Sequence, residues 1–367
     1  MDSSVSSPLA QREAADAPAQ EVATGRIAVV LFNLGGPDSL EAVQPFLYNL
    51  FADPAIIRLP RPFRLFLARL ISKRRAPIAR EIYAQMGGRS PIVPNTDAQA
   101  EALRESLGDL GTIGVFPVMR YWHPRADAVA EDVAAFNPDS LILLPLYPQF
   151  STTTSGSSIE EWQREAKRVG LKNCPTHTVC CYPTERGFVA ELAGLIKPRL
   201  EEAAKHGKPR LLLSAHGLPE KIVKDGDPYQ RQVEMTAEAT REALGIEDLD
   251  LVVCYQSRVG PMKWIGPATI DEVQRAGADG CPLVLAPVAF VSEHSETLVE
   301  LDIELAEVAE EAGVPSYHRV PTVDAGAAFI EGLSQLVRAA MKQPPGVASL
   351  TGGRLCSPDR RGCPCRP

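Results

Sequence analysis

The sequence predicts an α/β fold with parallel sheets, and three observations support that prediction. Continuous apolar runs recur along the chain, as expected of strands that helices cover on both faces. Amphipathic helical stretches lie between these runs, and strands that alternate with helices pair in parallel. The chain has 367 residues, which is enough for about two domains.

The expected strands end in polar residues that are suited to ligand binding. The strands are 26–33, 140–146, 210–213, 249–253 and 282–290. The polar segments that follow or close them include 33–36, 147–149, 214–217 and 255–257. In open α/β sheets, ligands bind outside the carboxyl ends of the strands. We therefore expect the functional site at these ends.

Two helices have distinct sequence signals. One begins at Asp227-Pro228, a capping residue followed by proline at the first helical position, and runs to Gly245. The other covers about 323–341 and carries apolar residues on one face. We expect this second helix to pack against the body of the protein.

We predict five segments along the chain. The first, 1–25, is small, polar and partly acidic, which is typical of a disordered arm and not of a signal or transit peptide. The others are a first domain, a second domain, a helix that packs back on the body and a cysteine-rich tail, at 26–170, 171–320, 321–343 and 344–367.

The composition excludes several classes of protein. Apolar residues make up 45% and charged residues 23% of the chain, so disorder throughout is excluded. The net charge of −8 argues against nucleic-acid binding, which needs a basic surface. No apolar stretch is long enough to span a membrane, so we expect a cytoplasmic protein. Cytoplasmic cysteines are usually reduced, metal-bound or catalytic.

His216 is the first candidate site residue. It closes an apolar strand and precedes Gly217-Leu218-Pro219. A histidine in this position can accept a proton or bind a metal ion near neutral pH. The alternative is a histidine whose ring is satisfied by neighbouring backbone groups.

An acidic stripe follows the last strong strand. Its carboxylates share one helical face and are Glu293, Glu296, Glu300 and Glu304, with His294 beside them. Such a row can carry protons or divalent cations. The alternative is a solvated helix face.

A basic amphipathic helix is expected over 61–75. Its apolar stripe contains Phe63, Phe66, Leu67, Leu70 and Ile71, and its polar face is entirely basic. This pattern is typical of a membrane-surface element, and the cations could also hold an anionic substrate. An ordinary helix packed on the core is the alternative.

The tail carries Cys356, Cys363 and Cys365. Three cysteines this close suit thiolate ligation of a metal. An iron–sulfur cluster needs a fourth ligand, for which the candidates are Cys174, Cys180 and Cys181. The alternative is an unstructured, reduced tail.

Together these segments resemble the ferrochelatase family, the enzymes that insert ferrous iron into a porphyrin to make haem. The likeness extends from about residue 27 to residue 342. The motifs that carry it lie at 31–37, 73–77, 87–92, 119–124, 147–149, 214–219, 226–229, 255–261 and 293–298.

The resemblance implies two Rossmann-like domains, each a parallel sheet flanked by helices, with a porphyrin cleft between them. His216 matches the family's essential histidine, and Glu296 matches the carboxylate that faces it across the macrocycle. Glu293, His294 and Glu300 match a polar path for protons or metal.

Eight further residues match positions that line the porphyrin pocket or bind its propionates. They are Leu34, Arg74, Arg75, Tyr83, Arg120, Tyr121, Tyr147 and Trp264. The stretch 50–75 matches a lip that dips into the bilayer, which implies peripheral association with the inner membrane. The apolar stripe of this lip favours protoporphyrin IX as substrate over coproporphyrin.

The chemistry of metal insertion suits these residues. A free-base porphyrin must lose two pyrrole protons as Fe²⁺ enters, so a base near the ring nitrogens is needed. We hypothesise that His216 takes the protons, and that iron arrives along Glu300, Glu296 and His294. The alternatives are a chelatase for another metal or tetrapyrrole, a haem or metal carrier without catalysis, and an iron–sulfur electron-transfer protein.

The tail spacing is similar to that of certain bacterial members of the family with a [2Fe-2S] cluster. Cluster-bearing animal members instead have an internal cysteine in the loop that matches 151–154, which has none here. The resemblance therefore implies three tail ligands and leaves the fourth open.

Overall fold

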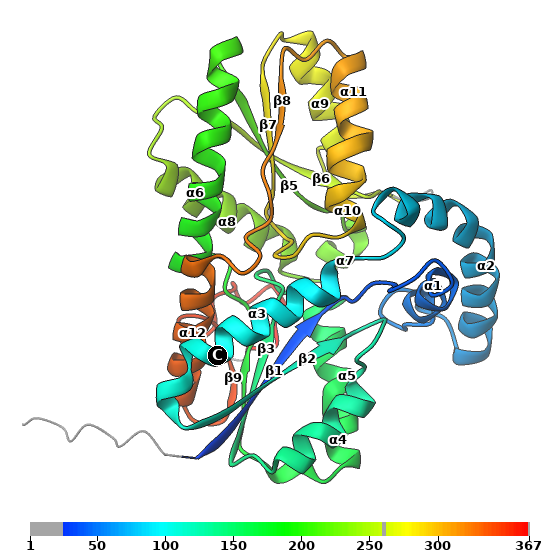
Figure 1. Ribbon diagram of the computed structural model, residues 1–367, viewed down its shortest axis with the longest axis vertical. Helices are drawn as coiled ribbons and strands as arrows, with labels where there is room; N and C mark the ends of the chain where they lie inside the picture. The colour runs from blue at the N-terminus through cyan, green and yellow to red at the C-terminus, as the bar shows by residue number, and fades with distance from the viewer. Residues whose placement is uncertain (1–24, 259–261, 366–367) are drawn as a thin grey trace, which may run out of the picture.

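The computed structural model describes residues 25–258 and 262–365. They form two sheets that follow one another along the long axis of the molecule, with helices around each (Figure 1). Every pairing between the named strands is parallel. The predicted α/β fold with two parallel sheets is confirmed.

The first sheet has five strands in the order β2-β1-β3-β4-β9. Their bounds are β1 Arg26–Asn33, β2 Thr112–Met119, β3 Ser140–Pro145, β4 Thr176–Val179 and β9 Gly346–Ala348. The chain's helices up to β4 are α1 Val43–Phe51, α2 Arg61–Gln85, α3 Ile92–Ser106, α4 Ala126–Phe136 and α5 Ser155–Arg168, with short 3₁₀ turns at Gly108–Leu110 and Leu171–Asn173. Alternate residues of β1 belong to two different cores, one with α3 and one with α4 and α5. This explains why β1 is an unbroken apolar run.

The second sheet has four strands in the order β6-β5-β7-β8. Their bounds are β5 Arg210–His216, β6 Asp250–Gln256, β7 Leu283–Pro287 and β8 Tyr317–Arg319. The remaining helices are α6 Arg186–Ala203, α7 Glu220–Lys224, α8 Tyr229–Leu244, α9 Thr269–Ala278, α10 Ser295–Leu298, α11 Leu305–Glu311 and α12 Ala327–Met341, with a 3₁₀ turn at Ala204–His206 and a π-helical turn at Glu300–Glu304. Helices α9 and α11 share a core with one face of the sheet, and α6 and α8 with the other.

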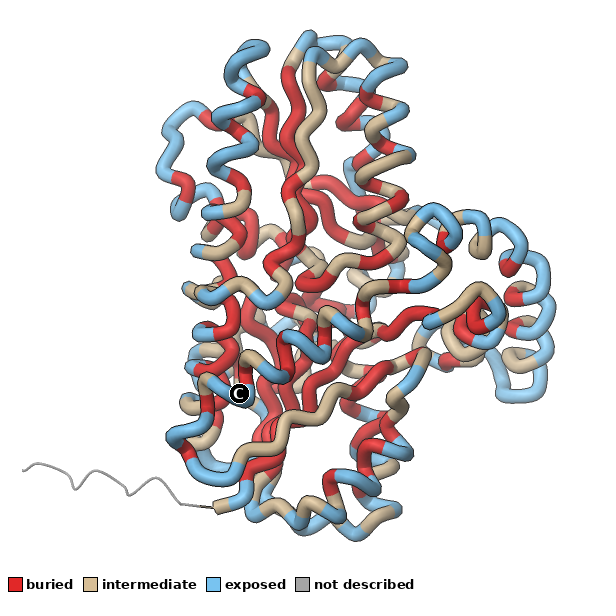
Figure 2. The backbone as a smooth tube through the Cα atoms, viewed as in Figure 1, coloured by how far each residue is buried: buried red, intermediate tan, exposed pale blue. Residues whose placement is uncertain are grey.

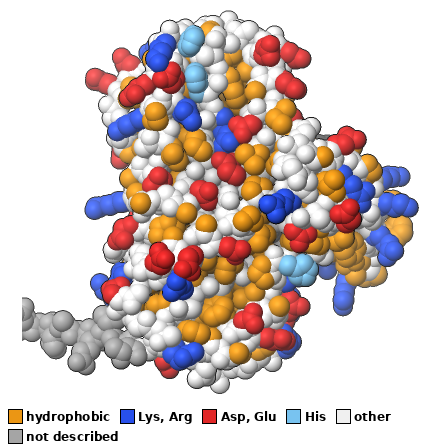
Figure 3. Space-filling model, in the orientation of Figure 1, with side chains coloured by type: hydrophobic (Ala, Val, Ile, Leu, Met, Phe, Trp, Pro, Cys, Tyr) orange, Lys and Arg blue, Asp and Glu red, His pale blue; other side chains and the backbone are white. Residues whose placement is uncertain are grey.

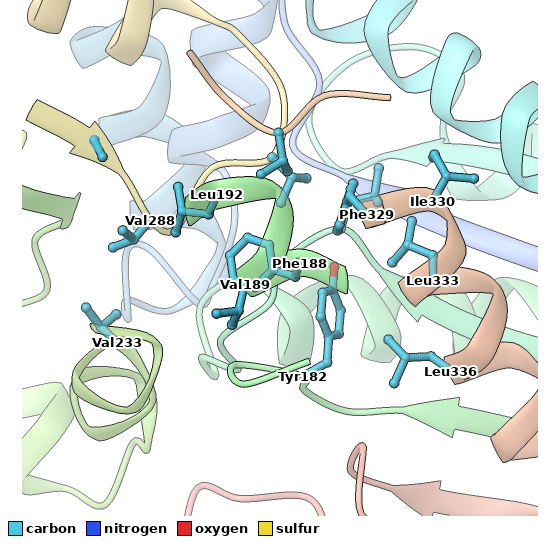
Figure 4. Packing of buried hydrophobic residues seen from close by; sticks show 14 of the residues in the cluster. Tyr182, Phe188, Val189, Leu192, Val233, Val288, Phe329, Ile330, Leu333 and Leu336 are labelled. Carbon is cyan, nitrogen blue, oxygen red and sulfur yellow. The ribbon is translucent and has the colours of Figure 1, made fainter. Parts of the chain in front are cut away.

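One continuous apolar core joins the two halves. Buried residues run from β1 in the first sheet to β5 and β7 in the second, so red segments fill the centre of the molecule in Figure 2. Figure 4 shows Phe188 and Leu192 of α6 close to Phe329 and Leu333 of α12 within this core. The predicted helix before the tail is present as α12, and it packs on α6 and α3.

Strand β4 lies beyond the domain boundary predicted at 170, yet it pairs with β3 in the first sheet. The tail returns to the same sheet, because β9 pairs with β4. The chain therefore crosses to the second sheet after Val179. The four residues Thr-His-Thr-Val of β4 contain no apolar run, so the sequence pattern did not reveal this strand. The domain bounds themselves stay a prediction.

Strand β2 was also absent from the predicted strands. It lies at the edge of the first sheet and is only half-buried over most of its length. Pro117 within it is tolerated because an edge strand has one side without sheet partners. Of the predicted N-terminal arm, 1–25, all but Gly25 lies outside the described residues, as does the segment 259–261 of one motif.

Candidate active site

A histidine and a glutamate meet at the carboxyl end of the second sheet. His216 is the last residue of β5, and Glu296 lies in the first turn of α10, which follows β7. The Nδ1 atom of His216 is 2.8 Å from Oε2 of Glu296. A porphyrin ring cannot lie between two atoms this close, so in this structure the two side chains stand together and not on opposite sides of a ring. The strand ends bring them together because α10 begins close to the end of the strand beside β5.

The two groups shift each other's pKa in opposite directions. Burial alone would raise the pKa of Glu296, but the charge of His216 and the hydrogen bond between them lower it to about 2. Burial alone would lower the pKa of His216, but Glu296 outweighs burial and raises it above its ordinary value. The pair is therefore stabilised as carboxylate and imidazolium.

Glu300 extends this site along the helix, in the first residue of the π-helical turn. Burial and the nearby charge of Glu296 raise the pKa of its carboxyl group. Its Oε1 atom accepts a hydrogen bond of 2.8 Å from the backbone N–H of Ser257. The predicted acidic stripe thus places two carboxylates, those of Glu296 and Glu300, beside the histidine.

Two polar residues after β6 hold these carboxylates. The Ser257 hydroxyl contacts carboxylate oxygens of both Glu296 and Glu300. The Gln256 amide donates to the backbone carbonyl of Glu296 at 2.9 Å. Ser257 adopts a φ of 60°, which is a strained backbone conformation for a residue other than glycine. The same residue contacts both carboxylates. Both residues lie in the polar strand end 255–257, but the candidate site residues taken from the sequence did not include them.

His294 lies next to this group but does not bond to it. Its Nδ1 atom is 3.2 Å from the backbone carbonyl of Ser292, and its ring packs on Phe290 with centroids 4.6 Å apart. Burial lowers its pKa, which favours a neutral imidazole.

Glu293 is directed elsewhere. Its Oε1 atom forms an ion pair of 2.5 Å with Arg319 and accepts a 3.0 Å hydrogen bond from the backbone N–H of Thr322. Burial opposes its ionisation, but the charge of Arg319 lowers its pKa. The arginine neutralises this carboxylate, so the structure separates Glu293 from the Glu296–Glu300 pair.

Three of the predicted pocket residues lie near the catalytic pair or the strand ends. Burial raises the pKa of Tyr83, at the end of α2, to about 12, and the nearby Ser295 side chain opposes this rise. Trp264 lies against Gly217, where an added Cβ would come within 3.3 Å of the indole ring. Leu34 directly follows β1 and is half-buried.

Arg120, Tyr121 and Tyr147 belong to a different, buried group. Arg120 forms ion pairs of 2.7 Å with Asp53 and 2.9 Å with Glu161, and its side chain is only 12% exposed. The Tyr121 hydroxyl donates to the same Asp53 carboxylate at 2.8 Å. Burial raises the pKa of Tyr147, which is close enough to Arg120 for its charge to oppose that rise. The sequence pattern did not single out Asp53 or Glu161.

Arg74 and Arg75 lie on the exposed side of α2. Helices α1 and α2 protrude from the body (Figure 1), and Figure 3 shows cations and hydrophobic side chains gathered on this protrusion. Phe63 and Phe66 of α2 are 67% and 72% exposed. A cavity of about 460 Å³ opens where α2 ends, lined by Met86, Arg89 and Leu298 among others. Within the described residues, no helix is both long and apolar enough to cross a membrane.

The tail cysteines meet Cys180 and Cys181, and not Cys174. Cys180, Cys181 and Cys365 are buried in one apolar cluster, against which Cys363 packs. The sulfur atoms of Cys180 and Cys181 are 3.5 Å apart. A hydrogen bond from Cys356 lowers the pKa of Cys363 to about 6.

Cys174 packs instead with the core under α4 and α5. Across residues 25–258 and 262–365, no group of three or more His, Cys, Asp or Glu side chains is arranged to hold a metal ion.

Two parallel sheets and a histidine–carboxylate pair at their strand ends define an α/β protein with an acid–base site. A family model described as Ferrochelatase matches residues 26–341. The chain belongs to the ferrochelatase family.

Curated relatives agree with this assignment. A Ferrochelatase from Caulobacter vibrioides is 52% identical over 347 residues, which cover 94% of this chain and 98% of the relative. Another, from Wolbachia sp. subsp. Drosophila simulans, is 53% identical over 311 residues and covers 84% and 98%. Among solved structures, SirB from Bacillus subtilis with Fe3+ covers 86% of this chain and 96% of its own, with a TM-score of 0.48 and 12% identity.

Proposed function

We propose that this protein inserts Fe²⁺ into protoporphyrin IX, the last step of haem synthesis, with His216 and Glu296 as the reacting pair. Membership of the ferrochelatase family supports iron insertion. The observation that carries the residue assignment is the 2.8 Å contact between a histidine and a carboxylate at the strand ends. A carrier that only bound haem would need no such acid–base pair.

His216 takes the pyrrole protons in this mechanism. The free-base ring holds two N–H protons, and both must leave for the nitrogen lone pairs to bind Fe²⁺. Neutral imidazole accepts a proton at Nε2 while Nδ1 remains bonded to Glu296, and the carboxylate stabilises the imidazolium that forms. Each proton then leaves to water, so one turnover releases two protons.

Iron is a substrate, and we propose that it arrives along Glu300, Glu296 and His294. The two carboxylates share contacts with Ser257, and both lie in the same helical segment. Carboxylate and imidazole are suitable ligands for Fe²⁺. Glu293 has no part in this path, because Arg319 holds its carboxylate.

The porphyrin lies, in this proposal, beneath the protruding α1–α2 segment, where Tyr83 and Trp264 approach the catalytic pair. Leu34 and Tyr147 follow β1 and β3, and both lie at the carboxyl end of the first sheet. Arg74 and Arg75 are exposed on α2 and suit the porphyrin's carboxylates.

The same segment is proposed to rest on the inner membrane, which makes the protein a peripheral membrane protein on the cytoplasmic side. Exposed Phe63 and Phe66 lie on a helix whose cations include Arg61, Arg69 and Lys73. Aromatic side chains flanked by cations bind the boundary between anionic headgroups and acyl chains. An apolar porphyrin could enter from there.

We also propose a [2Fe-2S] cluster at the cysteine site, held by Cys356, Cys363, Cys365 and Cys180. The donor set suits a cluster, because the thiols come from two chain segments that pack together. Cys180 and Cys365 are buried, and Cys356 and Cys363 are half-buried. Cys180 is favoured over Cys181 because its pKa responds to Cys181 and also to Cys363 of the tail. The described sulfurs are not arranged to hold a metal ion in this structure. Such a cluster would supply one-electron redox chemistry.

Anaerobic iron insertion tests the function directly. The full chain is given Fe²⁺ with protoporphyrin IX or coproporphyrin in parallel, and the metalloporphyrin spectrum is followed. We expect faster turnover with protoporphyrin IX. Preference for coproporphyrin would reassign the substrate, and absence of turnover with both would contradict the proposal.

A further inference from the structure

A buried carboxylate ties the protruding α1–α2 segment to the first sheet. Asp53 follows α1, and its side chain is 1% exposed. Its Oδ2 atom accepts hydrogen bonds from Arg120 at 2.7 Å, from the Tyr121 hydroxyl at 2.8 Å and from the Ser157 hydroxyl at 2.8 Å. Its Oδ1 atom accepts from the backbone N–H of Ala55 at 2.8 Å. The Asp53 carboxylate, at the base of the α1–α2 segment, thus accepts hydrogen bonds from four donors.

The arginine in this group has no free nitrogen atom. Arg120 donates from Nη2 to Asp53, from Nη1 to Glu161 at 2.9 Å and from Nε to Ser157 at 2.8 Å. Glu161 is in turn paired with Arg125 at 3.0 Å. The charges alternate from the segment to the body, as Asp53, Arg120, Glu161 and Arg125, and Arg164 also lies 3.5 Å from Glu161. Each of the three nitrogen atoms of Arg120 therefore already bonds to a protein group.

A second contact strengthens the same attachment. The Asn49 amide of α1 donates to the backbone carbonyl of Tyr121 at 3.0 Å. Tyr121 thus accepts a hydrogen bond from Asn49 at its backbone carbonyl and donates one to Asp53 from its hydroxyl. Because β2 ends at Met119, both contacts fix the segment to the end of one strand.

The far end of the segment reaches the catalytic pair. Tyr83, at the end of α2, is buried and lies close enough to Ser295, the neighbour of Glu296, for that side chain to lower its pKa. Helix α2 spans Arg61 to Gln85, with Pro77 inside it, and links the base of the segment to Tyr83. The attachment at Asp53 therefore influences the space in front of His216.

We propose that Asp53 is a positioning residue for the porphyrin, and that Arg120 holds the α1–α2 segment in place instead of binding a porphyrin carboxylate. The inference rests on the proposed function, in which the porphyrin lies beneath this segment. Asp53 acts through Arg120 and Tyr121 and does not touch the substrate.

The test is the Asp53→Asn variant, assayed anaerobically with Fe²⁺ and either protoporphyrin IX or its dimethyl ester in the same detergent. Loss of the charged hydrogen bonds should raise KM for the porphyrin about tenfold, with kcat little changed. KM should rise for both the acid and the ester, because the segment lies over the ring that both molecules share. The rise for the acid also includes any weakening of its contacts with Arg74 and Arg75 on α2. Asp38→Asn is the matched control, since Asp38 is exposed on the approach to α1 and should leave KM unchanged.

The opposite role for Arg120 gives the opposite result. If Arg120 binds a porphyrin carboxylate, Asp53→Asn releases it for that task, and KM for the acid falls or stays constant while the ester is unaffected. That outcome overturns the inference, and so does a fall in kcat at constant KM. Lack of iron insertion by the wild-type protein would instead refute the proposed function.

Tyr121→Phe keeps the test decisive if Asp53→Asn does not fold. It removes one donor to Asp53 and leaves both buried charges paired. We expect a smaller KM increase, again for both the acid and the ester, in protein whose circular dichroism matches the wild type. An unchanged KM in this variant contradicts the proposal.

Discussion

At the scale of single residues, the site is an ion pair between His216 and Glu296. In the proposed mechanism, His216 must lose its proton before it can accept one from the porphyrin. Glu296 raises the pKa of His216, and His216 lowers the pKa of Glu296 to about 2. A base with a raised pKa binds its proton more tightly, so a larger fraction of it is protonated at a given pH. Glu296 therefore makes His216 a stronger base that becomes available only at higher pH.

Glu296→Gln should separate these two effects. In the wild type, turnover should rise with pH as His216 loses its proton, with a midpoint above the ordinary histidine pKa, because Glu296 raises the pKa of His216. The amide removes the charge that causes this, and burial then lowers the histidine pKa, so the midpoint moves to lower pH. Maximal kcat should fall about 100-fold or more, with a smaller change in porphyrin affinity.

The measurement is kcat as a function of pH for both proteins. An unmoved midpoint would show that another group controls the acid limb. His216→Ala is the companion variant, since it should abolish most turnover, and near-normal activity would contradict its assignment as proton acceptor.

At the scale of elements, the α2 helix combines an internal and an external role. Its buried side packs Ala68, Ser72 and Ala76 against the protein, while Phe63 and Phe66 remain exposed. An exposed aromatic pair on a helix with six cations in 61–75 has no partner within the described residues. The proposed membrane surface would cover it.

We expect the double variant Phe63→Ser/Phe66→Ser to lose binding to vesicles that contain anionic phospholipids. Each phenylalanine contributes up to about 2 kcal/mol when buried, so the loss should exceed tenfold in partition coefficient. Flotation of the protein with vesicles measures it. Ile246→Ser, at an exposed position after α8, is the control and should bind as the wild type does. Equal binding by both variants would locate the membrane contact elsewhere.

At the scale of the whole molecule, the tail returns to the first sheet and closes the chain on itself. Strand β9 pairs with β4, and the next residues pack beside the Cys180–Cys181 pair. The backbone N–H of Gly362 also donates to the carbonyl of Gly226, before α8. The tail therefore contacts both halves, which places the proposed cluster at their junction.

The cluster ligands can be tested by substitution. Cys180→Ser should abolish the visible absorption of the purified protein and its bound iron, as Cys363→Ser should, because a three-thiolate site binds a cluster poorly. Cys174→Ser should retain both, since this thiol packs against a different cluster, the one under α4 and α5. A colourless wild-type protein would refute the cluster. If the visible absorption is lost in Cys181→Ser and kept in Cys180→Ser, then Cys181 is the fourth ligand.

The sequence predicted the strands whose two faces are both buried, and it missed strands that are only partly buried or very short. In β1, seven of eight residues are buried, which produces an apolar run. Strand β2 is half-buried, and β4 has four residues with two threonines and a histidine. Periodicity records burial, so an edge strand or a very short strand leaves little signal.

The sequence indicated His216, Glu296 and Glu300 as site residues, but it did not single out Gln256 or Ser257, and it did not show how the charges pair. Sequence position put His216 and Glu296 at strand ends, and these ends meet because the sheet is parallel. It did not show that the two side chains touch, that Arg319 holds Glu293, or that Asp53 and Glu161 occupy Arg120. Those partners lie 80, 26, 67 and 41 residues apart in the chain.

Local patterns and motifs in the sequence were therefore enough to predict the α/β class, the family and the strand-end location of His216 and Glu296. Only the tertiary structure decided which charges are paired and which remain available. The reason is physical: a buried charge must find an opposite charge or a hydrogen-bond partner, and that partner is supplied by whichever distant segment the fold brings into contact.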